Sequence, residues 1–354
     1  MAKIRREIGR LLGGLDDLLA ILPERLAQRR RDAAFPAELL QTPGALPAGA
    51  KVAIFVLFQA RGIAPSTLLT CEHLASQGYA LLVMSNAPLS PVDRQALAAR
   101  SWRVVERPNQ GHDFGAWRDG IRLLRHFGLI PEWLVLLNDS VWFPLVEDDS
   151  LLARMETEDG FTGALWMERP GRVHRAHFQS WLTMFGPRAL AHPAFRAFWD
   201  GYLASSRRAS VLLRGEKGLS RAMVHAGLAS PPLASPALLL RHAEAADASE
   251  LARILAYAAL TGPVRATRDR LLVDPQAQGF HAAALALISS TLMSGPVLET
   301  HPYLVAQAAG LHILKKRNEA TSVEARRQFL RAVDAGDLPA PPPMVLAEIR
   351  ARDP

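Results

Sequence analysis

The sequence predicts an α/β protein built around a mostly parallel β-sheet. Short apolar runs alternate with segments of helical periodicity from Lys51 onward, an order typical of parallel sheets. One run, Trp133–Leu137, is apolar on both faces, as a strand inside such a sheet should be. The expected strands are Val52–Phe58, Ala80–Ser85, Arg103–Glu106 and Trp133–Leu137, and the helices between them are Ser66–Ser76, Pro91–Ala99 and Gly115–His126.

The length and charge of the chain bound its organisation and its partners. A chain of 354 residues exceeds a usual single domain, so we assign 1–49 to a helical segment with linker, 50–240 to the main domain and 241–354 to a C-terminal helical region. The net charge of +7 is spread along the chain and suits anionic partners. Because no zinc spacing or helix-turn-helix signature accompanies it, nucleic acid is not an expected partner.

The N-terminal segment Met1–Arg31 has leucine and isoleucine at helical spacing among many arginines, which predicts an amphipathic basic helix or helix pair. Such a helix could pack on the main domain or on a partner subunit, or it could lie on an anionic membrane. We favour packing, because the segment has no bulky aromatic anchor. Ala34–Ala50 is rich in proline and glycine and is expected to be a linker.

The second half predicts mixed structure followed by helices. The expected strands are Phe161–Trp166 and Phe178–Phe185, and the expected helices are Pro193–Leu203, Leu219–Ala226, Glu250–Leu260, His281–Leu292, Leu304–Leu314 and Val323–Val333. The proline-rich stretch Leu338–Pro343 is expected to end the compact part. The single cysteine, Cys71, lies in an apolar helical pattern and is expected in the core. With no internal disulfide and no apolar signal segment, a cytoplasmic protein is predicted.

The chemistry is expected between Pro108 and Leu145. Gly111 and Gly115 punctuate a polar loop, where the backbone can turn tightly or approach a ligand. After the buried strand Trp133–Leu137 come three polar residues, Asn138-Asp139-Ser140. Ligands of open α/β sheets bind at the carboxyl ends of the strands, so these residues mark the expected site.

Four motifs in this order carry a family resemblance: N-x-G-x-D-F-G-A-W-R-D-G from Asn109, L-L-N-D-S from Leu136, F-Q-S-W from Phe178 and G-E-K-G-L-S from Gly215. Over roughly Lys51 to Leu228 the chain resembles the rhamnan synthesis protein F family of bacterial glycosyltransferases. The resemblance implies a GT-A-like, Rossmann-type sheet that binds a nucleotide sugar.

The resemblance also implies an activity and its partners. The expected reaction is inverting transfer of rhamnose from dTDP-L-rhamnose to a growing cell-surface polysaccharide, with a glycan or lipid-linked glycan as acceptor. The expected location is the cytoplasm, with peripheral contact to the anionic cytoplasmic face of the inner membrane. Two alternatives stay open: a GT-A-like transferase for a different nucleotide sugar, and a degenerate module that binds or scaffolds without catalysis.

For the nucleotide, the resemblance implies a cradle at successive strand ends. Gln59 and Asn86 correspond to the nucleobase and ribose positions of GT-A enzymes, and Asn109, Gly111 and Asp113 follow at the third strand. Asparagine also favours plain turns, which is the alternative for Asn86 and Asn109.

The leaving diphosphate needs its charge neutralised. GT-A enzymes usually hold Mg²⁺ or Mn²⁺ with an Asp-x-Asp after the fourth strand, but this tripeptide keeps one carboxylate, Asp139, between Asn138 and Ser140. Asp139 is therefore the predicted catalytic and metal-binding residue, with Asp113 as a second carboxylate. In a metal-free site, Arg118 could bind phosphate instead. The alternative for Asp139 is a turn cap.

Glu216 is the predicted catalytic base. It precedes an expected helix and resembles the acidic residue on the acceptor side of inverting GT-A enzymes; a solvated first-turn glutamate is the alternative. His177 and Gln179 are the predicted acceptor contacts, although lone histidines are commonly structural.

Overall fold

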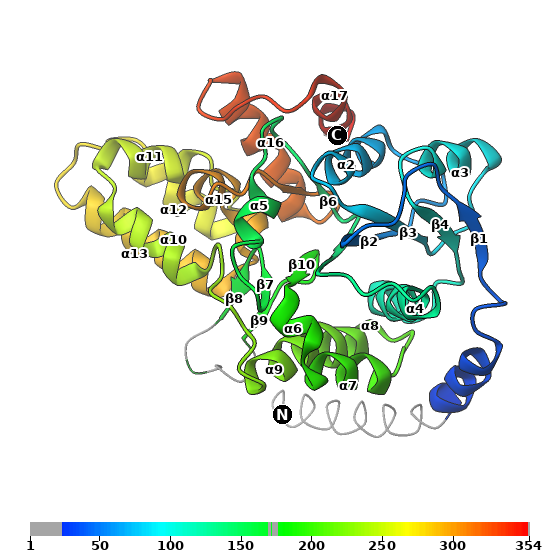
Figure 1. The fold of residues 1–354 in the computed structure, drawn as a ribbon. Coiled ribbons are helices and arrows are strands. Elements are labelled where there is room, and N and C mark those ends of the chain that lie inside the picture. The colour runs from blue at the N-terminus through cyan, green and yellow to red at the C-terminus, as the bar shows by residue number, and fades with distance from the viewer. Residues whose placement is uncertain (1–22, 169–170, 172–175, 353–354) are drawn as a thin grey trace.

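The computed structural model describes residues 23–168, 171 and 176–352, and its centre is a seven-stranded mixed sheet of order β1-β4-β3-β2-β5-β10-β7 (Figure 1). The central strands β4, β3, β2 and β5 run parallel; β1 is antiparallel to β4, and β10 is antiparallel to both of its neighbours, β5 and β7. This confirms the predicted α/β class. The strands are β1 Leu40–Pro43, β2 Lys51–Leu57, β3 Ala80–Ser85, β4 Arg103–Glu106, β5 Trp133–Asn138, β7 Phe161–Gly163 and β10 Leu182–Phe185.

Helices cover both faces of this sheet. α2 (Pro65–Ser76) and α3 (Pro91–Ala98) pack on one face, and α4 (His112–His126) packs on the other (Figure 1). Alternate side chains of β2 enter two different buried clusters, as the period of a strand requires. The sheet is therefore buried on both sides, which explains its continuous apolar runs. Cys71 lies in α2 with its thiol buried, so its predicted core role is confirmed.

Two local predictions need correction. The expected linker Ala34–Ala50 contains β1, which forms the edge of the main sheet and pairs antiparallel with β4; prolines are tolerated at a sheet edge, and here they masked the strand signal. Helix α4 begins at His112 rather than at Gly115, because Gly111 takes the N-cap position with a φ of +74°.

Both strands expected after Asp148 are split. The chain forms β7 and then β8 (Trp166–Met167), and later β9 (His177–Phe178) and then β10. β8 and β9 pair with each other in a separate two-stranded sheet, so the chain leaves the main sheet and returns to it at Leu182.

Helices make up most of the remaining chain. They are α5 Leu151–Met155, α6 Pro187–Ala191, α7 Pro193–Gly201, α8 Arg208–Ser210, the π-helical turn η2 Val211–Glu216, α9 Lys217–His225, α10 Pro236–Ala245, α11 Ala248–Ala256, α12 Gly262–Leu271, α13 Phe280–Ser294, α14 Val297–Thr300, α15 Pro302–Ala309, α16 Ala320–Asp334 and α17 Pro343–Ala351. None of the helices in the described ranges is long and apolar enough to cross a membrane.

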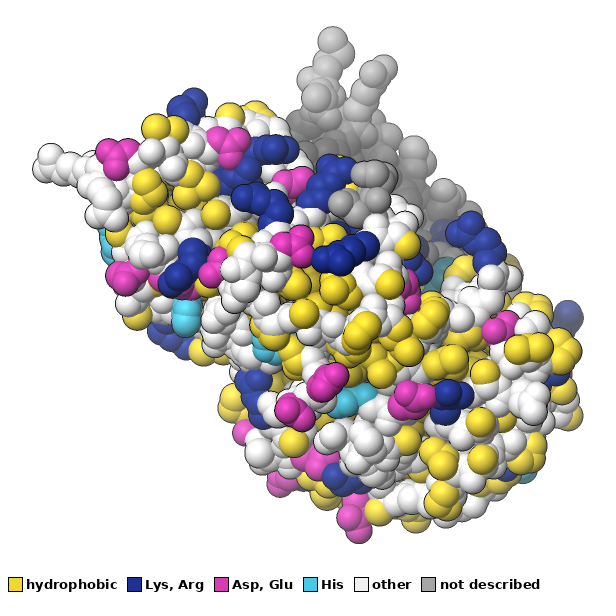
Figure 2. All heavy atoms as spheres, turned by 90° about the horizontal axis from the view of Figure 1, so that it is seen from above, with side chains coloured by type: hydrophobic (Ala, Val, Ile, Leu, Met, Phe, Trp, Pro, Cys, Tyr) yellow, Lys and Arg dark blue, Asp and Glu magenta, His cyan; other side chains and the backbone are white. Residues whose placement is uncertain are grey.

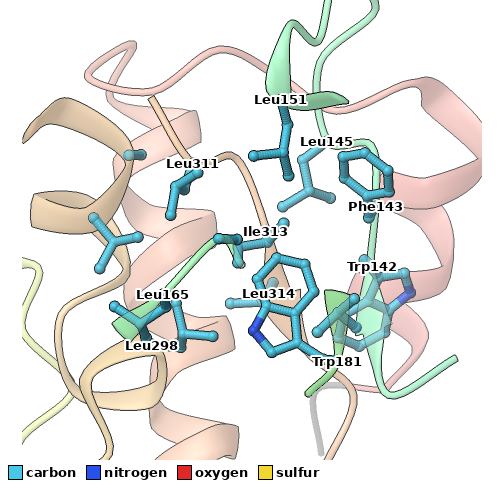
Figure 3. Close-up of a cluster of buried hydrophobic side chains, with 14 of the residues drawn as sticks. Trp142, Phe143, Leu145, Leu151, Leu165, Trp181, Leu298, Leu311, Ile313 and Leu314 are labelled. Atoms are coloured by element: carbon cyan, nitrogen blue, oxygen red, sulfur yellow. The ribbon is translucent and has the colours of Figure 1, made fainter. Parts of the chain in front are cut away.

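The C-terminal helices share one buried cluster with the sheet. A short strand, β11 (Leu314–Lys315), pairs antiparallel with β6 (Val141–Trp142), just beyond the end of β5. Figure 3 shows Ile313 and Leu314 packed among Trp142, Trp181 and neighbouring leucines. The division into 1–49, 50–240 and 241–354 stays a prediction.

The expectation that the compact part ends at Leu338–Pro343 is wrong. Pro343 begins α17, a position where proline is favoured, and α17 packs against α2. The Glu348 carboxylate accepts hydrogen bonds from the Ser66 backbone N–H (3.2 Å) and from Trp142 Nε1 (2.9 Å).

The described part of the N-terminal segment, residues 23–34, is helical and lies against the main domain. Asp32 accepts two hydrogen bonds of 2.8 Å from the buried Arg118 guanidinium, and Gln28 bonds to the backbone of Tyr202 and Ala204. Residues 1–22 of the predicted amphipathic helix lie outside the described residues. Figure 2 shows basic and acidic side chains interspersed on the face seen from above.

Candidate active site

A cavity of about 570 Å³ lies beyond the carboxyl end of β5, a size typical of small-molecule sites. Residues from five parts of the chain line it: Asp113 of α4; Asn138 and Ser140 at the end of β5; Met167, Glu168, His177, Gln179, Ser180 and Trp181 around β8 and β9; Arg208, Leu212, Glu216 and Lys217 around η2; and Gly295, Pro296, Glu299, Lys315 and Arg317 in the C-terminal region. The sheet end predicted to hold the site is thus hollowed, and the C-terminal region forms one of its walls.

Asn138 and Asp113 are joined at the sheet side of this cavity. Asn138 Nδ2 donates to Asp113 Oδ2 over 2.7 Å, and Asn138 Oδ1 accepts from the Ser140 backbone N–H and hydroxyl. Burial, followed by the nearby Asp139 carboxylate, raises the pKa of Asp113 to about 6. Asp113 therefore changes charge close to neutral pH.

Gly111 fixes where α4 begins and so where Asp113 stands. Its positive φ favours glycine, and a Cβ there would lie 2.6 Å from the Ala204 Cβ. Gly215 is constrained in a similar way, because a Cβ at this position would lie 2.7 Å from the Phe114 ring. Gly111 therefore lets the segment at Ala204 approach the start of α4, and Gly215 lets η2 pack closely on α4, so that Glu216 lines the same cavity as Asp113.

Glu216 is held by three hydrogen bonds at the end of the π-helical turn η2, a geometry common at functional sites. Its Oε2 accepts from the Ser180 backbone N–H (2.9 Å) and from Ser180 Oγ (2.6 Å), and its Oε1 lies 3.1 Å from His177 Nε2. Burial by itself raises the pKa of Glu216, but the bonds from His177 and Ser180 outweigh it and lower the pKa overall. Glu216 is therefore an oriented carboxylate at neutral pH.

Half of the predicted site residues line the cavity, and half do not. Those that line it are Asp113, Asn138, Ser140, His177, Gln179 and Glu216, while Gln59, Asn86, Asn109, Gly111, Arg118 and Asp139 lie outside its wall.

Asp139 connects the ends of two strands. Its Oδ2 accepts from the Phe58 backbone N–H (3.1 Å) and from Gln59 Nε2 (2.9 Å), just after β2. Gln59 Nε2 also donates to Thr67 Oγ1 over 2.7 Å. The structure thus brings Asp139 and Gln59 together at the carboxyl ends of β5 and β2, beside the cavity rather than in its wall.

The remaining predicted residues have partners in the protein or face solvent. The Asn86 amide oxygen accepts from the Arg107 guanidinium over 2.6 Å, and Arg118 is paired with Asp32. Asn109 is exposed.

The residues around the predicted metal position do not form a cage of hard oxygen ligands. Among the described residues, no group of three or more His, Cys, Asp or Glu side chains could hold a metal ion. Asp113, near the start of α4, lines the cavity, whereas Asp139, after β5, does not. This donor set does not fit a divalent ion held by the protein alone, which takes many oxygen ligands.

Sequence reasoning missed the contribution of the C-terminal region. Glu299, Lys315 and Arg317 line the cavity, although no motif surrounds them in the sequence. The helical spacing of apolar residues before Lys315 predicted a helix over Leu304–Leu314. In the structure α15 ends at Ala309, and the chain then extends into β11.

With this geometry established, the family comparison can be placed on the structure. Residues 81–229 match the family of rhamnan synthesis protein F. The predicted resemblance is thereby confirmed. The segment matching rhamnan synthesis protein F runs from β3 to just after α9 and includes Asp113, Asn138 and Glu216, but not Lys315.

Similarity to a second protein extends further along the chain. An uncharacterized protein, y4gN, of Sinorhizobium fredii (strain NBRC 101917 / NGR234) is 27% identical over 348 residues, which cover 94% of this chain and 89% of that protein. This similarity therefore reaches into the C-terminal region that completes the cavity, beyond the segment that matches rhamnan synthesis protein F.

Proposed function

We propose that the protein is a GT-A-like glycosyltransferase that uses a nucleotide-sugar donor in polysaccharide biosynthesis. The observation that carries this proposal is the cavity beyond β5, which places Asp113, Asn138 and Glu216 around one space. All three belong to the segment that matches a family described as rhamnan synthesis protein. An α/β sheet with polar residues at its carboxyl edge is the architecture expected for a nucleotide-sugar site.

The substrates are proposed from the family resemblance. The proposed donor is dTDP-L-rhamnose, and the proposed acceptor is a glycan or lipid-linked glycan of a growing cell-surface polysaccharide. Gln59, Asn86 and Asn109 are proposed on the nucleotide side. The reaction would take place at the cytoplasmic face of the inner membrane, where residues 1–22 could contact anionic lipid.

In the proposed reaction an acceptor hydroxyl attacks the anomeric carbon of the donor. The new carbon–oxygen bond forms as the bond from that carbon to the diphosphate breaks, which inverts the configuration and releases the nucleoside diphosphate. Glu216 takes the hydroxyl proton, and Ser180 and His177 hold its carboxylate in place. Asp113 is the second candidate for the base, because its raised pKa keeps it a stronger base than Glu216.

Asp139 is proposed to support this site from beside the cavity. Its bonds to the Phe58 backbone and to Gln59 hold the loop after β2 against the end of β5. Asn138, Ser140, His177 and Gln179 are proposed to contact the donor or acceptor directly, since all four line the cavity.

One observation favours a second candidate function. The tripeptide after β5 keeps a single carboxylate, and this residue is turned away from the cavity, which would suit a GT-A-like module that binds without catalysis. Donor hydrolysis without acceptor, measured over a panel of nucleotide sugars, separates the candidates. Preferential hydrolysis of dTDP-L-rhamnose supports the full proposal. Preferential hydrolysis of another nucleotide sugar would mean that this sugar, and not dTDP-L-rhamnose, is the donor. Binding without hydrolysis of any donor would leave the non-catalytic module.

A further inference from the structure

The short strand β11 holds Lys315 at the predicted site by backbone bonds. Lys315 is paired with Val141 in the β11–β6 ladder, and the next backbone N–H, of Lys316, donates to the Ser140 carbonyl over 2.9 Å. Successive side chains of a strand point to opposite faces. Lys315 accordingly lines the cavity, whereas Lys316 Nζ donates to Ser66 Oγ on the side of α2.

Among the described residues, the Lys315 ammonium is buried without a hydrogen bond or an ion pair within 4.0 Å, and only 7% of the residue is exposed. The centroid of the Trp181 ring lies 5.7 Å from its Nζ, and Glu299 is the carboxylate that acts most strongly on its charge. A buried cation in this state is costly, and an anion entering the cavity would offset that cost.

A second hydrogen-bond donor stands beside it. Trp181 is 2% exposed, lines the cavity, and its Nε1 finds no acceptor among the described residues. The Asn138 backbone N–H donates to the Trp181 carbonyl over 3.2 Å, which fixes this residue at the end of β5. Arg317 adds a further positive charge to the same wall.

We infer that Lys315, with Trp181 and Arg317 beside it, binds the diphosphate of the nucleotide-sugar donor and supplies the positive charge that GT-A enzymes usually take from a metal ion. This inference rests on the proposed function. It makes the C-terminal region part of the donor site and assigns its ligand as a nucleoside diphosphate group. The cavity wall carries the cations Arg208, Lys217, Lys315 and Arg317 beside the carboxylates of Asp113, Glu168, Glu216 and Glu299, and among the described residues no group of three or more His, Cys, Asp or Glu side chains could hold a metal ion.

The test is calorimetric binding of dTDP, UDP, GDP and CDP to the full chain in excess EDTA. Wild type should bind at least one of them, and Lys315→Met should weaken that binding about 10- to 100-fold, the range of a lost charge-assisted hydrogen bond. Lys51→Met is the matched control: it removes the same charge at the opposite end of β2, where Lys51 pairs with Glu156, and should leave binding unchanged. Lys315→Gln serves if the methionine variant does not fold.

A pH series adds an independent readout. Burial lowers the pKa of Lys315 to about 8, and Arg317 contributes to this lowering. Glu299 opposes it most strongly, and Glu216 and Asp113 oppose it more weakly. Nucleotide affinity of wild type should therefore fall as pH rises from about 7 to about 9. Lys315→Arg should keep binding and lose this pH dependence, since arginine stays protonated there.

Each outcome has a distinct meaning. If wild type binds and Lys315→Met binds equally well, the inference is overturned while the proposed function stands. If wild type binds only after Mn²⁺ or Mg²⁺ is added, a metal holds the diphosphate and the inference is again overturned. If wild type binds no nucleoside diphosphate with or without metal, the proposed function itself fails.

Discussion

Replacing Glu216 by glutamine should slow donor turnover about 100- to 10,000-fold, because a positioned general base contributes that much. This corresponds to about 3–5 kcal/mol of activation free energy. The introduced amide has nearly the same shape and keeps an oxygen that can accept from Ser180. The glutamine lacks the charge that strengthens these bonds, which destabilises the variant. It also avoids the cost of burying a carboxylate, which offsets part of that loss. The unfolding free energy should therefore change by less than about 2 kcal/mol.

The assay is release of nucleoside diphosphate from the donor that the panel selects, with donor affinity measured separately by calorimetry. Donor Kd should change little, so the loss appears in kcat. Glu132→Gln is the matched control, since Glu132 is an exposed glutamate outside the cavity wall and should tolerate the same change.

The pH profile of wild type decides between the two carboxylates. If Glu216 is the base, kcat/KM should stay level from neutral pH down to below the ordinary glutamate pKa of 4.5, since the folded protein lowers that pKa. An acid limb near pH 6 would instead report Asp113, whose pKa is raised to about 6. Such a limb, together with near-normal turnover in Glu216→Gln, would refute the assignment of Glu216 as the base.

Three further predictions concern residues around the site. Asp139→Asn should reduce turnover far more than folded yield, and EDTA should silence the enzyme only if a metal is used; wild-type turnover in this variant would remove Asp139 from the site. Deleting residues 1–31 should lower the Tm without changing vesicle binding if the segment packs on the protein, whereas loss of salt-sensitive binding to anionic vesicles would indicate a membrane helix. Asp32→Ala should lower the unfolding free energy by about 2–4 kcal/mol, because the buried Arg118 guanidinium loses its hydrogen-bonded carboxylate and keeps only Asp119, 4.0 Å away, as an ion-pair partner; urea titration measures this. Although burial alone raises the Asp32 pKa, Arg118 and Arg122 lower it overall, so this stabilisation should disappear as pH falls through and below 3.8.

The parallel part of the fold could be predicted because each of its strands is a local signal. Ala80–Ser85 and Arg103–Glu106 were predicted with the bounds that the structure has, since both are short apolar runs between helical segments. The strand end Asn138-Asp139-Ser140 followed from the same pattern. The antiparallel strands were harder, because β8 and β9 are only two residues long and pair outside the main sheet.

Which side chains line the site was only partly predictable, because the direction in which a side chain points depends on its tertiary contacts. Asp139 and Asn138 are neighbours in the sequence, yet Asn138 lines the cavity and Asp139 points to Gln59. The burial of Lys315 follows from its pairing with Val141, far away in the sequence, so no local pattern could have indicated it. Glu216 was found because its motif lies in one continuous stretch.

The position of Lys315 bears on what the smallest active unit is. The segment matching rhamnan synthesis protein F ends at residue 229, before α14 with Glu299, β11 with Lys315 and the helices around them. Those helices also bury the side chains of the sheet face that holds Phe55, in one continuous cluster that runs through Leu304 and Phe329 to Ile349. A chain cut after residue 240 would therefore expose this apolar surface to water and lose one wall of the cavity at the same time. Folding and donor binding thus depend on the same C-terminal residues, which is why the binding tests above use point variants of the full chain.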